Sequence, residues 1–250
     1  ERLMHNSLNV LITGATSGIG EALVNHYANE NYRVTACGRN QEKLSQLQSI
    51  TQLGLAFDVN NENDIELAAA QVDDIDILIL NAGDCRYITN PMAFDSDLFE
   101  DIINTNLVSL GKLIKHFLPK VKKGGQVVFI SSSATIIPFP QAEAYGASKA
   151  GMDYLANSLR LDLVDHQIDV TLVHPGFVRT PLTAVNHFNM PFIIDADDAA
   201  ARIFNGIKAR KAYLHFPKRL TLTLKLMSLL PRKVWQHIIL KDTNSRETIK

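Results

Sequence analysis

The sequence predicts an α/β fold in which a doubly wound, mostly parallel sheet of seven strands lies between two layers of helices. Short apolar runs alternate with helical patterns along most of the 250 residues, which is typical of strand-helix-strand crossover units. With 46% hydrophobic and 20% charged residues the chain can bury a sizeable core, and we expect one domain over residues 4–250. The strands are expected at 9–13, 33–37, 53–57, 75–80, 126–131, 170–174 and 212–215.

A glycine-rich loop follows the first expected strand and opens the first expected helix. Gly14, Gly18 and Gly20 let the backbone turn tightly, approach a pyrophosphate and pack the helix on the strand, while the first helical amides face the phosphates. Ser17 and Ile19 are expected to contact the same ligand, although the Ile19 side chain could equally belong to the core. Glycines alone would also fit a plain turn, so the loop needs support from elsewhere in the chain.

The end of the second strand predicts which dinucleotide binds. In dinucleotide-binding folds the residue after this strand meets the adenosine ribose, and an acidic side chain there favours NAD(H). Gly38 and Arg39 occupy this point, and the Arg39 guanidinium can bind a 2′-phosphate with two hydrogen bonds. We therefore expect NADP(H), the alternative being that Arg39 is an ordinary solvated charge. After the third strand, Asp58 and Val59 are expected at the adenine; Asp58 could also cap the following helix.

A long amphipathic helix is expected over 96–118, after a turn of small residues at 81–83 that would let the backbone lie against the cofactor ribose. Asn104 and Asn106 interrupt this helix. An asparagine in the middle of a helix usually points to solvent or bends the helix, and this is what we expect of Asn104.

Tyr145 and Lys149 lie four residues apart near the start of a helix expected over 144–165, so they share one helical face. A phenol has an ordinary pKa of ~10 and is a weak acid-base catalyst at neutral pH, but an adjacent ammonium stabilises the phenolate. We therefore expect Lys149 to lower the pKa of Tyr145, which would make the phenol a tuned acid. Such a pair is also common by chance.

The glycine loop, the turn at 81–83 and the Tyr145/Lys149 pair together resemble the short-chain dehydrogenase/reductase family, in its short single-domain branch. The resemblance covers about residues 7–215 and implies a Rossmann fold. Ser132 lies thirteen residues before Tyr145, which is the usual family spacing, and Asn106 falls where the family carries its fourth catalytic residue. The segment 175–180 matches the one that surrounds the nicotinamide.

The resemblance implies an oxidoreductase that transfers a hydride between the nicotinamide and a carbonyl or secondary alcohol. In the reductive direction Ser132 would orient the substrate carbonyl and Tyr145 would supply the proton. Lys149 would hold the nicotinamide ribose, and Asn106 would place a water that relays protons to it. Since Arg39 favours NADPH, we expect reduction in a cell. The cofactor contacts expected from position are Gly14, Ser17, Gly18, Ile19, Gly20, Arg39, Asp58, Val59, Asn81, Ala82, Gly83, Tyr145, Lys149, Pro175, Gly176, Val178 and Thr180.

Substrate choice in the family is set by a loop that follows this last segment, expected here at about 181–196. It carries Phe188, Met190 and Phe192, which together with Phe177 indicate an apolar pocket. The same rings could instead pack the loop onto the domain.

The C-terminal tail, at about 216–241, contains six lysines and arginines and no acidic residue, interleaved with leucines. One interpretation is a basic amphipathic element that touches a membrane or a lipid substrate. The other is a pair of helices, opened by Pro217 and Pro231, that covers the pocket or a partner subunit. The net charge of the whole chain is near zero, so we favour the second.

The bulk composition limits the function classes. A formal net charge of -1 gives no electrostatic reason to expect nucleic acid, and no apolar run approaches the ~20 residues that span a bilayer. Cys37 and Cys85 are too few for a disulfide framework, no metal-ligand spacing is present, and a reducing, cytoplasmic location is expected. The broad apolar faces of the helices at 96–118 and 144–165 predict a homodimer or homotetramer. A protein that binds NADP as a regulator, without catalysis, is the alternative to an enzyme with a small-molecule substrate.

Overall fold

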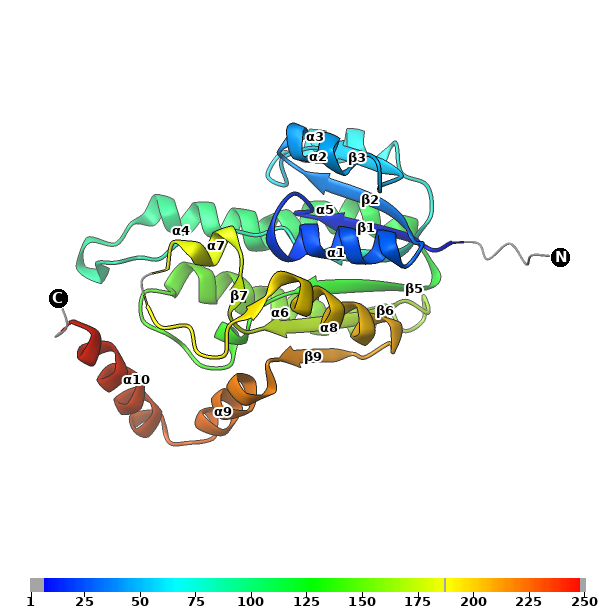
Figure 1. The fold of residues 1–250 in the computed structure, drawn as a ribbon. Coiled ribbons are helices and arrows are strands. Elements are labelled where there is room, and N and C mark those ends of the chain that lie inside the picture. The colour runs from blue at the N-terminus through cyan, green and yellow to red at the C-terminus, as the bar shows by residue number, and fades with distance from the viewer. Residues whose placement is uncertain (1–6, 187, 248–250) are drawn as a thin grey trace.

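The computed structural model of the protein describes the backbone of residues 7–186 and 188–247, and side chains within these ranges up to residue 240. Seven parallel strands form one sheet in the order β3-β2-β1-β4-β5-β6-β9 (Figure 1). The order reverses between β1 and β4, and in open α/β sheets ligands bind at the carboxyl ends of the strands beside this reversal. The strand bounds are β1 Asn9–Thr13, β2 Arg33–Gly38, β3 Leu53–Ala56, β4 Ile75–Leu80, β5 Val121–Ile130, β6 Asp169–Pro175 and β9 Tyr213–Phe216.

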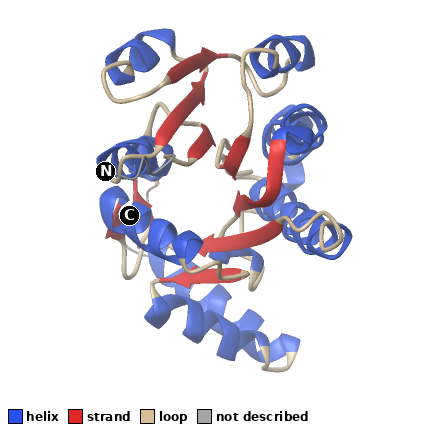
Figure 2. Ribbon diagram, turned by 90° about the vertical axis from the view of Figure 1, so that its right-hand side faces the viewer, coloured by secondary structure: helices blue, strands red, loops and turns tan. Residues whose placement is uncertain are grey.

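Helices cover both faces of the sheet, and each face has its own apolar core (Figure 2). In β1, Val10 and Ile12 belong to one core while Leu11 belongs to the other, because successive side chains of a strand point to opposite faces. This three-layer arrangement confirms the predicted α/β fold. The helices on the first face are α1 Gly18–Asn29, α2 Gln41–Leu47 and α8 Ala196–Lys208; on the second they are α3 Glu62–Ala69, α5 Ser109–Phe117 and α6 Glu143–Asp162.

The helical run expected over 96–118 is present, and it is interrupted at the asparagines as expected. Helix α4 (Ser96–Ile103) and α5 are joined by a π turn, Asn104–Val108, and Leu118 begins a 3-10 turn. A π turn holds one extra residue per turn, so it changes which side chains face inward. The disturbance expected at Asn104 is therefore present, and Asn106 is fully buried.

Other boundaries differ by a few residues. Strand β5 begins at Val121, five residues earlier than expected, because lysines and glycines at its start are weak strand signals and a register irregularity separates them from the apolar part. Two short strands that the sequence did not predict, β7 (Val178–Arg179) and β8 (Ile194–Asp195), flank α7 (Pro181–Ala184) and the loop after it.

The tail forms two helices, each preceded by a proline as expected. Helix α9 (Lys218–Ser228) follows Pro217 and helix α10 (Arg232–Glu247) follows Pro231. They lie beyond the sheet edge formed by β9 (Figure 1). Among the described helices, none has the length and apolar character needed to cross a membrane.

Candidate active site

The glycine loop lies at the carboxyl end of β1, against the turn that ends β4. Gly14 has a φ of +65°, and a side-chain carbon added there would lie 2.8 Å from the Cα of Ala82. A Cβ at Gly20 would lie 2.0 Å from the carbonyl oxygen of Gly14. Only glycine fits these two positions, which leaves a bare backbone cradle of the kind that accepts a pyrophosphate.

Thr13 is the first residue of the glycine motif, and it joins this loop to the turn after β4. Its Oγ1 accepts hydrogen bonds from the backbone N–H groups of Asn81 (3.0 Å) and Ala82 (3.1 Å). The Asn81 amide donates two bonds, to the carbonyl oxygens of Thr13 (3.0 Å) and Gly14 (3.2 Å). The sequence did not predict this role, although a threonine directly before the first glycine is visible in it.

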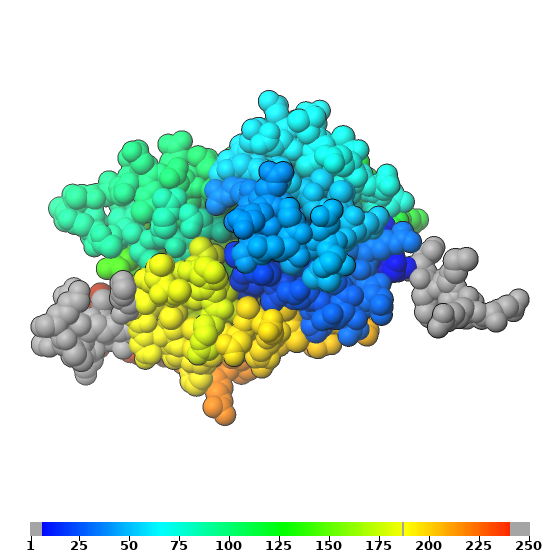
Figure 3. All heavy atoms as spheres, turned by 45° about the horizontal axis from the view of Figure 1, so that its top comes forward, coloured from blue at the N-terminus to red at the C-terminus, as the bar shows by residue number. Residues whose placement is uncertain are grey.

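The segment 175–180 closes over the same loop. A Cβ on Gly18 would lie 3.0 Å from the Cγ2 of Thr180, so the end of this segment touches the start of α1. In Figure 3 the yellow surface, which belongs to the region around residue 190, meets the blue surface of the N-terminal part of the chain. Ser17 is exposed at the N-cap of α1 and makes no capping bond through its side chain, whereas Ile19 packs against the core. Val178 is buried as well.

At the other end of the cradle, Arg39 and Asp58 follow the neighbouring strands β2 and β3. Their closest charged atoms are 3.7 Å apart, and the Arg39 side chain is 75% exposed. Val59 is buried next to them, and Asn61, not Asp58, caps α3 through its side chain. The alternative in which Asp58 caps that helix is therefore wrong, and its carboxylate accepts a bond from the N–H of Asn60 instead.

Ser132, Tyr145 and Lys149 converge beside the cradle. Ser132 follows β5, and its hydroxyl accepts a hydrogen bond from the backbone N–H of Ala134 at 3.1 Å. It lies close enough to Tyr145, in the first turns of α6, to oppose the rise in the pKa of that phenol that burial causes. Lys149 lies one turn further along α6; it is only 5% exposed, and its Nζ donates to the carbonyl oxygen of Ile130 at 2.9 Å. The same Nζ lies 5.9 Å from the centre of the Tyr145 ring.

Asn106 lies behind this group, and both hydrogens of its side-chain amide are used. The amide donates to the carbonyl oxygen of Asp84 at 2.8 Å and to the hydroxyl of Ser148 at 3.0 Å, while its Oδ1 accepts from the N–H of Asp84 at 2.7 Å. Asp84 and Ser148 were not predicted, although each directly adjoins a predicted motif. The side chain can take part in one further bond only, as an acceptor through Oδ1.

A model of the short chain dehydrogenase family matches residues 8–189 of the chain. The chain belongs to the short-chain dehydrogenase/reductase family. It is 32% identical over 241 residues to an uncharacterized oxidoreductase of Myxococcus xanthus, covering 90% of this chain and 93% of that one. It is 34% identical over 184 residues to a serine 3-dehydrogenase of Agrobacterium fabrum, covering 70% and 74%. A solved structure of serine dehydrogenase in a closed form with NADP+ superposes with a TM-score of 0.77 at 27% identity, covering 84% of this chain and 94% of that chain.

The protonation of the site departs from the sequence-based expectation. Burial raises the pKa of Tyr145 above its ordinary value of 10, and among its neighbours only Ser132 acts in the opposite direction. The prediction that Lys149 lowers this pKa is therefore wrong. Burial instead lowers the pKa of Lys149 to about 8, opposed by the carboxylate of Asp153 and by Cys85. At neutral pH the phenol therefore carries its proton.

Ser131, the neighbour of Ser132, has a structural partner. Its hydroxyl donates to the carboxylate of Asp153 at 2.5 Å, and the other oxygen of Asp153 is 2.9 Å from Nε2 of His174 on β6. These contacts bring Asp153 of α6 next to the end of β5 and to His174 on β6. It leaves Ser132, rather than Ser131, free to face a substrate.

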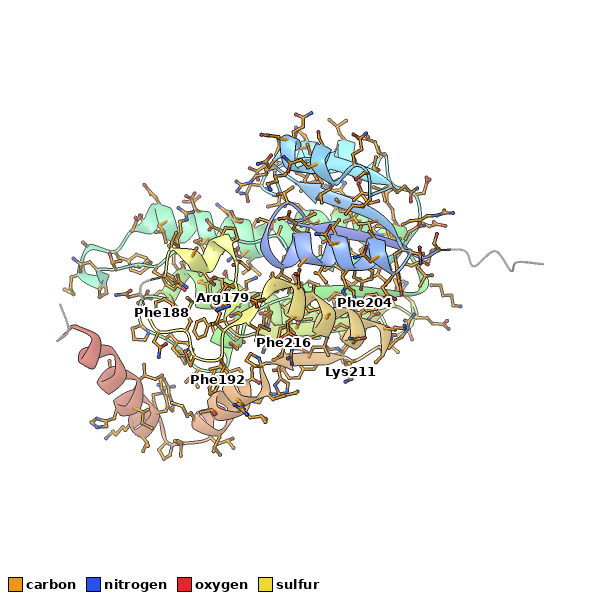
Figure 4. The ribbon with its side chains drawn as sticks, viewed as in Figure 1. Arg179, Phe188, Phe192, Phe204, Lys211 and Phe216 are labelled. Carbon is orange, nitrogen blue, oxygen red and sulfur yellow. The ribbon has the colours of Figure 1, made fainter. Side chains whose placement is uncertain are left out.

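We call the rings of Tyr87, Phe177 and Phe188 the aromatic wall. Tyr87 lies near Tyr145, since burial, Cys85 and the Tyr145 phenol all raise its pKa. Phe188, in the loop after α7, packs edge-on against Tyr87 at 5.6 Å and against Phe177 at 6.0 Å between ring centres. Phe192 is 49% exposed, and Figure 4 shows both loop phenylalanines on the side of the molecule that carries Arg179. The Sγ of Cys85 lies 3.4 Å from the hydroxyl of Tyr87. Nothing in the sequence pattern pointed to Cys85 or Tyr87.

A groove of about 590 Å³ opens nearby, between α10 and the loop that follows Ser132. Ile136, Ile137 and Pro138 line one side, and Leu230 and Trp235 line the other. No group of three His, Cys, Asp or Glu side chains in the described part of the chain could hold a metal ion.

Proposed function

We propose that this oxidoreductase uses NADP(H) to interconvert a carbonyl and a secondary alcohol, and that it acts mainly as a reductase. The observation that carries the proposal is that Ser132 and Tyr145 lie together beside buried Lys149 and the bare glycine cradle. These groups supply an oriented proton donor next to a dinucleotide site, which is what carbonyl reduction requires.

The cradle fits a dinucleotide because side chains are excluded where the pyrophosphate would lie. We assign Gly14, Ser17, Gly18, Gly20 and the turn at 81–83 to this role, and 175–180 to the nicotinamide end. Ile19 would contribute through its backbone, since its side chain packs on the core. When bound, NADPH would supply the hydride.

Arg39 supports the preference for the phosphorylated dinucleotide. Its guanidinium is exposed at the end of β2, and no acidic residue occupies that strand end to bind a ribose 2′-hydroxyl. The nearby carboxylate of Asp58 holds Arg39 loosely at 3.7 Å, so that the guanidinium can turn to a 2′-phosphate. The solved serine dehydrogenase, which is similar in fold, holds NADP+.

The residues would act as follows. Ser132 donates a hydrogen bond that orients the substrate carbonyl, and Tyr145 delivers its proton to the oxygen as charge develops there. The raised pKa of Tyr145 keeps this proton in place at neutral pH, which suits reduction. Lys149 would bind the ribose hydroxyls beside Tyr145, and a water placed by Asn106 would return a proton through Lys149.

The aromatic wall indicates the substrate class. Tyr87, Phe177 and Phe188 would present ring surface to a substrate at Tyr145, which favours a small apolar carbonyl compound. One relative is named for serine, a polar substrate, so substrate choice would differ between the two proteins. Within a single domain, the loop at 181–196 and the tail at 216–241 form the substrate side in this proposal.

We also propose a cytoplasmic homo-oligomer. The outer faces of the helices around the site expose Val108, Tyr154 and Leu161, at 44%, 81% and 75%. Large apolar side chains gathered on one face usually mark a subunit contact. A non-catalytic NADP sensor would not need Ser132, Tyr145 and Lys149 together, and we prefer the enzyme for that reason.

Turnover on a panel of carbonyl compounds with NADPH tests the proposal, with Tyr145→Phe as the decisive variant. Removing the donor hydroxyl is expected to lower kcat by about 10²-fold to 10⁴-fold, while NADPH binding stays unchanged. The matched control is Tyr154→Phe, because this phenol lies on the same helix but is 81% exposed. Full activity in Tyr145→Phe would refute the assigned role, and no turnover by the parent protein on any compound would favour the sensor.

A further inference from the structure

Helix α9 has two apolar faces. Leu220 and Leu224 are buried on the inner side, at 8% and 6% exposure. Leu222, Leu226 and Leu229 lie on the opposite side and are 55%, 67% and 82% exposed. Their spacing of four and three residues places these three leucines in one row along the helix. A helix that is apolar on both sides is normally packed against other groups on both sides. Here no element of the described chain packs over the outer row of leucines.

Helix α10 also exposes apolar side chains. Val234 and Ile238, four residues apart and therefore on one side of the helix, are each 44% exposed. Both helices lie at the end of the chain, outside the sheet edge at β9 (Figure 1). We call the row on α9 together with Val234 and Ile238 the tail surface.

Positive charge surrounds the tail surface. On the helical wheel of α9, Lys218 and Lys225 lie on one side of the leucine row and Arg219 lies on the other. Arg232 and Lys233 add two cations at the start of α10, and no aspartate or glutamate occurs from 216 to 241. Lys218 and Lys225 have neutral partners, since they meet a ring nitrogen of His215 and the ring of Tyr213. All five cations therefore keep their charge unpaired by any acid of the tail.

We propose that the tail surface docks on the face of an anionic lipid bilayer. Apolar side chains flanked by lysine and arginine are the pattern by which a helix lies in the plane of a membrane interface, with the cations at the phosphate level. The contact is peripheral, because no described helix is suited to span the bilayer. It is independent of the proposed reaction.

A second copy of the chain is a poorer occupant. In a twofold dimer a patch meets itself, so the five cations of one tail surface would face the same five cations of the other. No acidic residue in the tail could offset this repulsion. An anionic membrane buries the leucines among its acyl chains and pairs the cations with its phosphates.

Trp235 provides a built-in probe. It is the single tryptophan of the chain, and it lines the groove between α10 and the loop after Ser132, next to the tail surface. The first experiment adds vesicles of phosphatidylcholine, with or without about 30% phosphatidylglycerol, to the full-length protein and records fluorescence and co-sedimentation. We expect a blue shift and co-sedimentation with the anionic vesicles only, both weakened by added salt.

Two variants test the surface itself. Leu226→Ser with Leu229→Ser removes exposed apolar area, and Arg219→Glu with Lys233→Glu reverses charge; each pair is expected to weaken vesicle binding at least about tenfold. All four side chains are exposed, so the fold is expected to survive. Lys43→Glu with Lys123→Glu is the matched control, because it reverses two exposed cations on α2 and β5 and is expected to leave binding unchanged.

Light scattering of the same variants measures their oligomeric state, which distinguishes a lipid-binding surface from a subunit interface. Absence of binding to anionic vesicles, or equal loss in the control variant, overturns the proposal. If the leucine variant instead shifts the oligomeric state while vesicle binding is absent in every form, the tail surface is a subunit interface. Binding of an acidic protein, with no binding to vesicles, also contradicts a lipid partner.

Discussion

The two sides of the active site are held in different ways. Around the glycine loop, buried hydrogen bonds from Thr13 and Asn81 join the ends of β1 and β4, and steric exclusion admits only glycine at two points. On the proposed substrate side, Phe188 of the loop after α7 packs against the rings of Tyr87 and Phe177. Helices α9 and α10 leave leucines exposed there. Directional bonds fix one geometry, whereas ring contacts tolerate several. We infer that the cofactor side is preorganised and that the substrate side adapts to its ligand.

Gly20→Ala gives the largest expected effect, since it attacks the rigid side directly. The new Cβ would lie 2.0 Å from the carbonyl oxygen of Gly14, so the loop must move. We expect destabilisation of about 4 kcal/mol or more in urea unfolding and loss of dinucleotide binding in calorimetry. Gly111→Ala is the control, because no atom lies within 4 Å of its added Cβ; it is expected to stabilise α5 by about 0.5–1 kcal/mol. Normal nucleotide binding by Gly20→Ala would show that the cradle is not rigid.

Thr13→Val tests the hydrogen bonds of the same side without changing the shape of the side chain. Valine leaves the N–H groups of Asn81 and Ala82 without their acceptor, at a cost of about 1–3 kcal/mol for each buried group. Thr223→Val removes a hydroxyl that bonds the Arg219 carbonyl on an exposed turn of α9, and it is expected to change the free energy of unfolding by less than about 0.5 kcal/mol. If both variants lowered the free energy of unfolding equally, the hydrogen bonds of Thr13 would hold the cofactor side no more firmly than an exposed bond on α9 holds the tail.

Lys149→Met tests, through the pH dependence of the free energy of unfolding, how strongly the cofactor side buries its lysine. The pKa of Lys149 is about 8 in the folded protein against an ordinary 10.5, so between these values the unfolded chain binds a proton that the folded chain does not. The free energy of unfolding therefore gains a contribution that rises with pH across this window and is lost as pH falls through 8. We expect the methionine variant to gain most over the parent at pH 7, by about 1–3 kcal/mol, and less at pH 10.5. A difference that stays constant with pH would show that burial does not depress this pKa.

Phe188→Ala is expected to give the smallest effect on stability, because it alters the adaptable side. It removes ring contacts with Tyr87 and Phe177 from a half-buried loop residue, which is worth about 1 kcal/mol. For an apolar carbonyl substrate we expect KM to rise about tenfold with kcat nearly unchanged. Phe94→Ala, which removes a ring contact with Phe99 at 5.7 Å, is the control and is expected to leave KM unchanged. An effect on NADPH affinity larger than that on KM would place Phe188 on the cofactor side.

The same contrast explains what the sequence could predict. Glycines 14 and 20 are visible in sequence because a backbone requirement allows one residue type, and the strands because their apolar runs are buried on both faces. Cys85, Tyr87 and Asp84 could not be predicted, since a loop places them beside Tyr145 and Asn106 by contacts between distant residues. The two asparagines indicated an interruption of the helix, but not that the π turn would bury Asn106. The pKa of Tyr145 depends on burial by the folded chain, which a spacing of four residues does not report.

Binding of NADPH and NADH to the protein alone, measured by calorimetry with Arg39→Ala in parallel, tests the central claim most directly. If the cofactor side is preorganised for NADP(H), NADPH binds without substrate and at least about tenfold more tightly than NADH, a difference of ~1.4 kcal/mol. Arg39→Ala is then expected to abolish this difference, whereas Lys43→Ala, another exposed cation nearby in the chain, leaves it intact. Equal affinity for the two nucleotides would contradict the assignment of Arg39, and no binding of either would contradict the preorganised cradle itself.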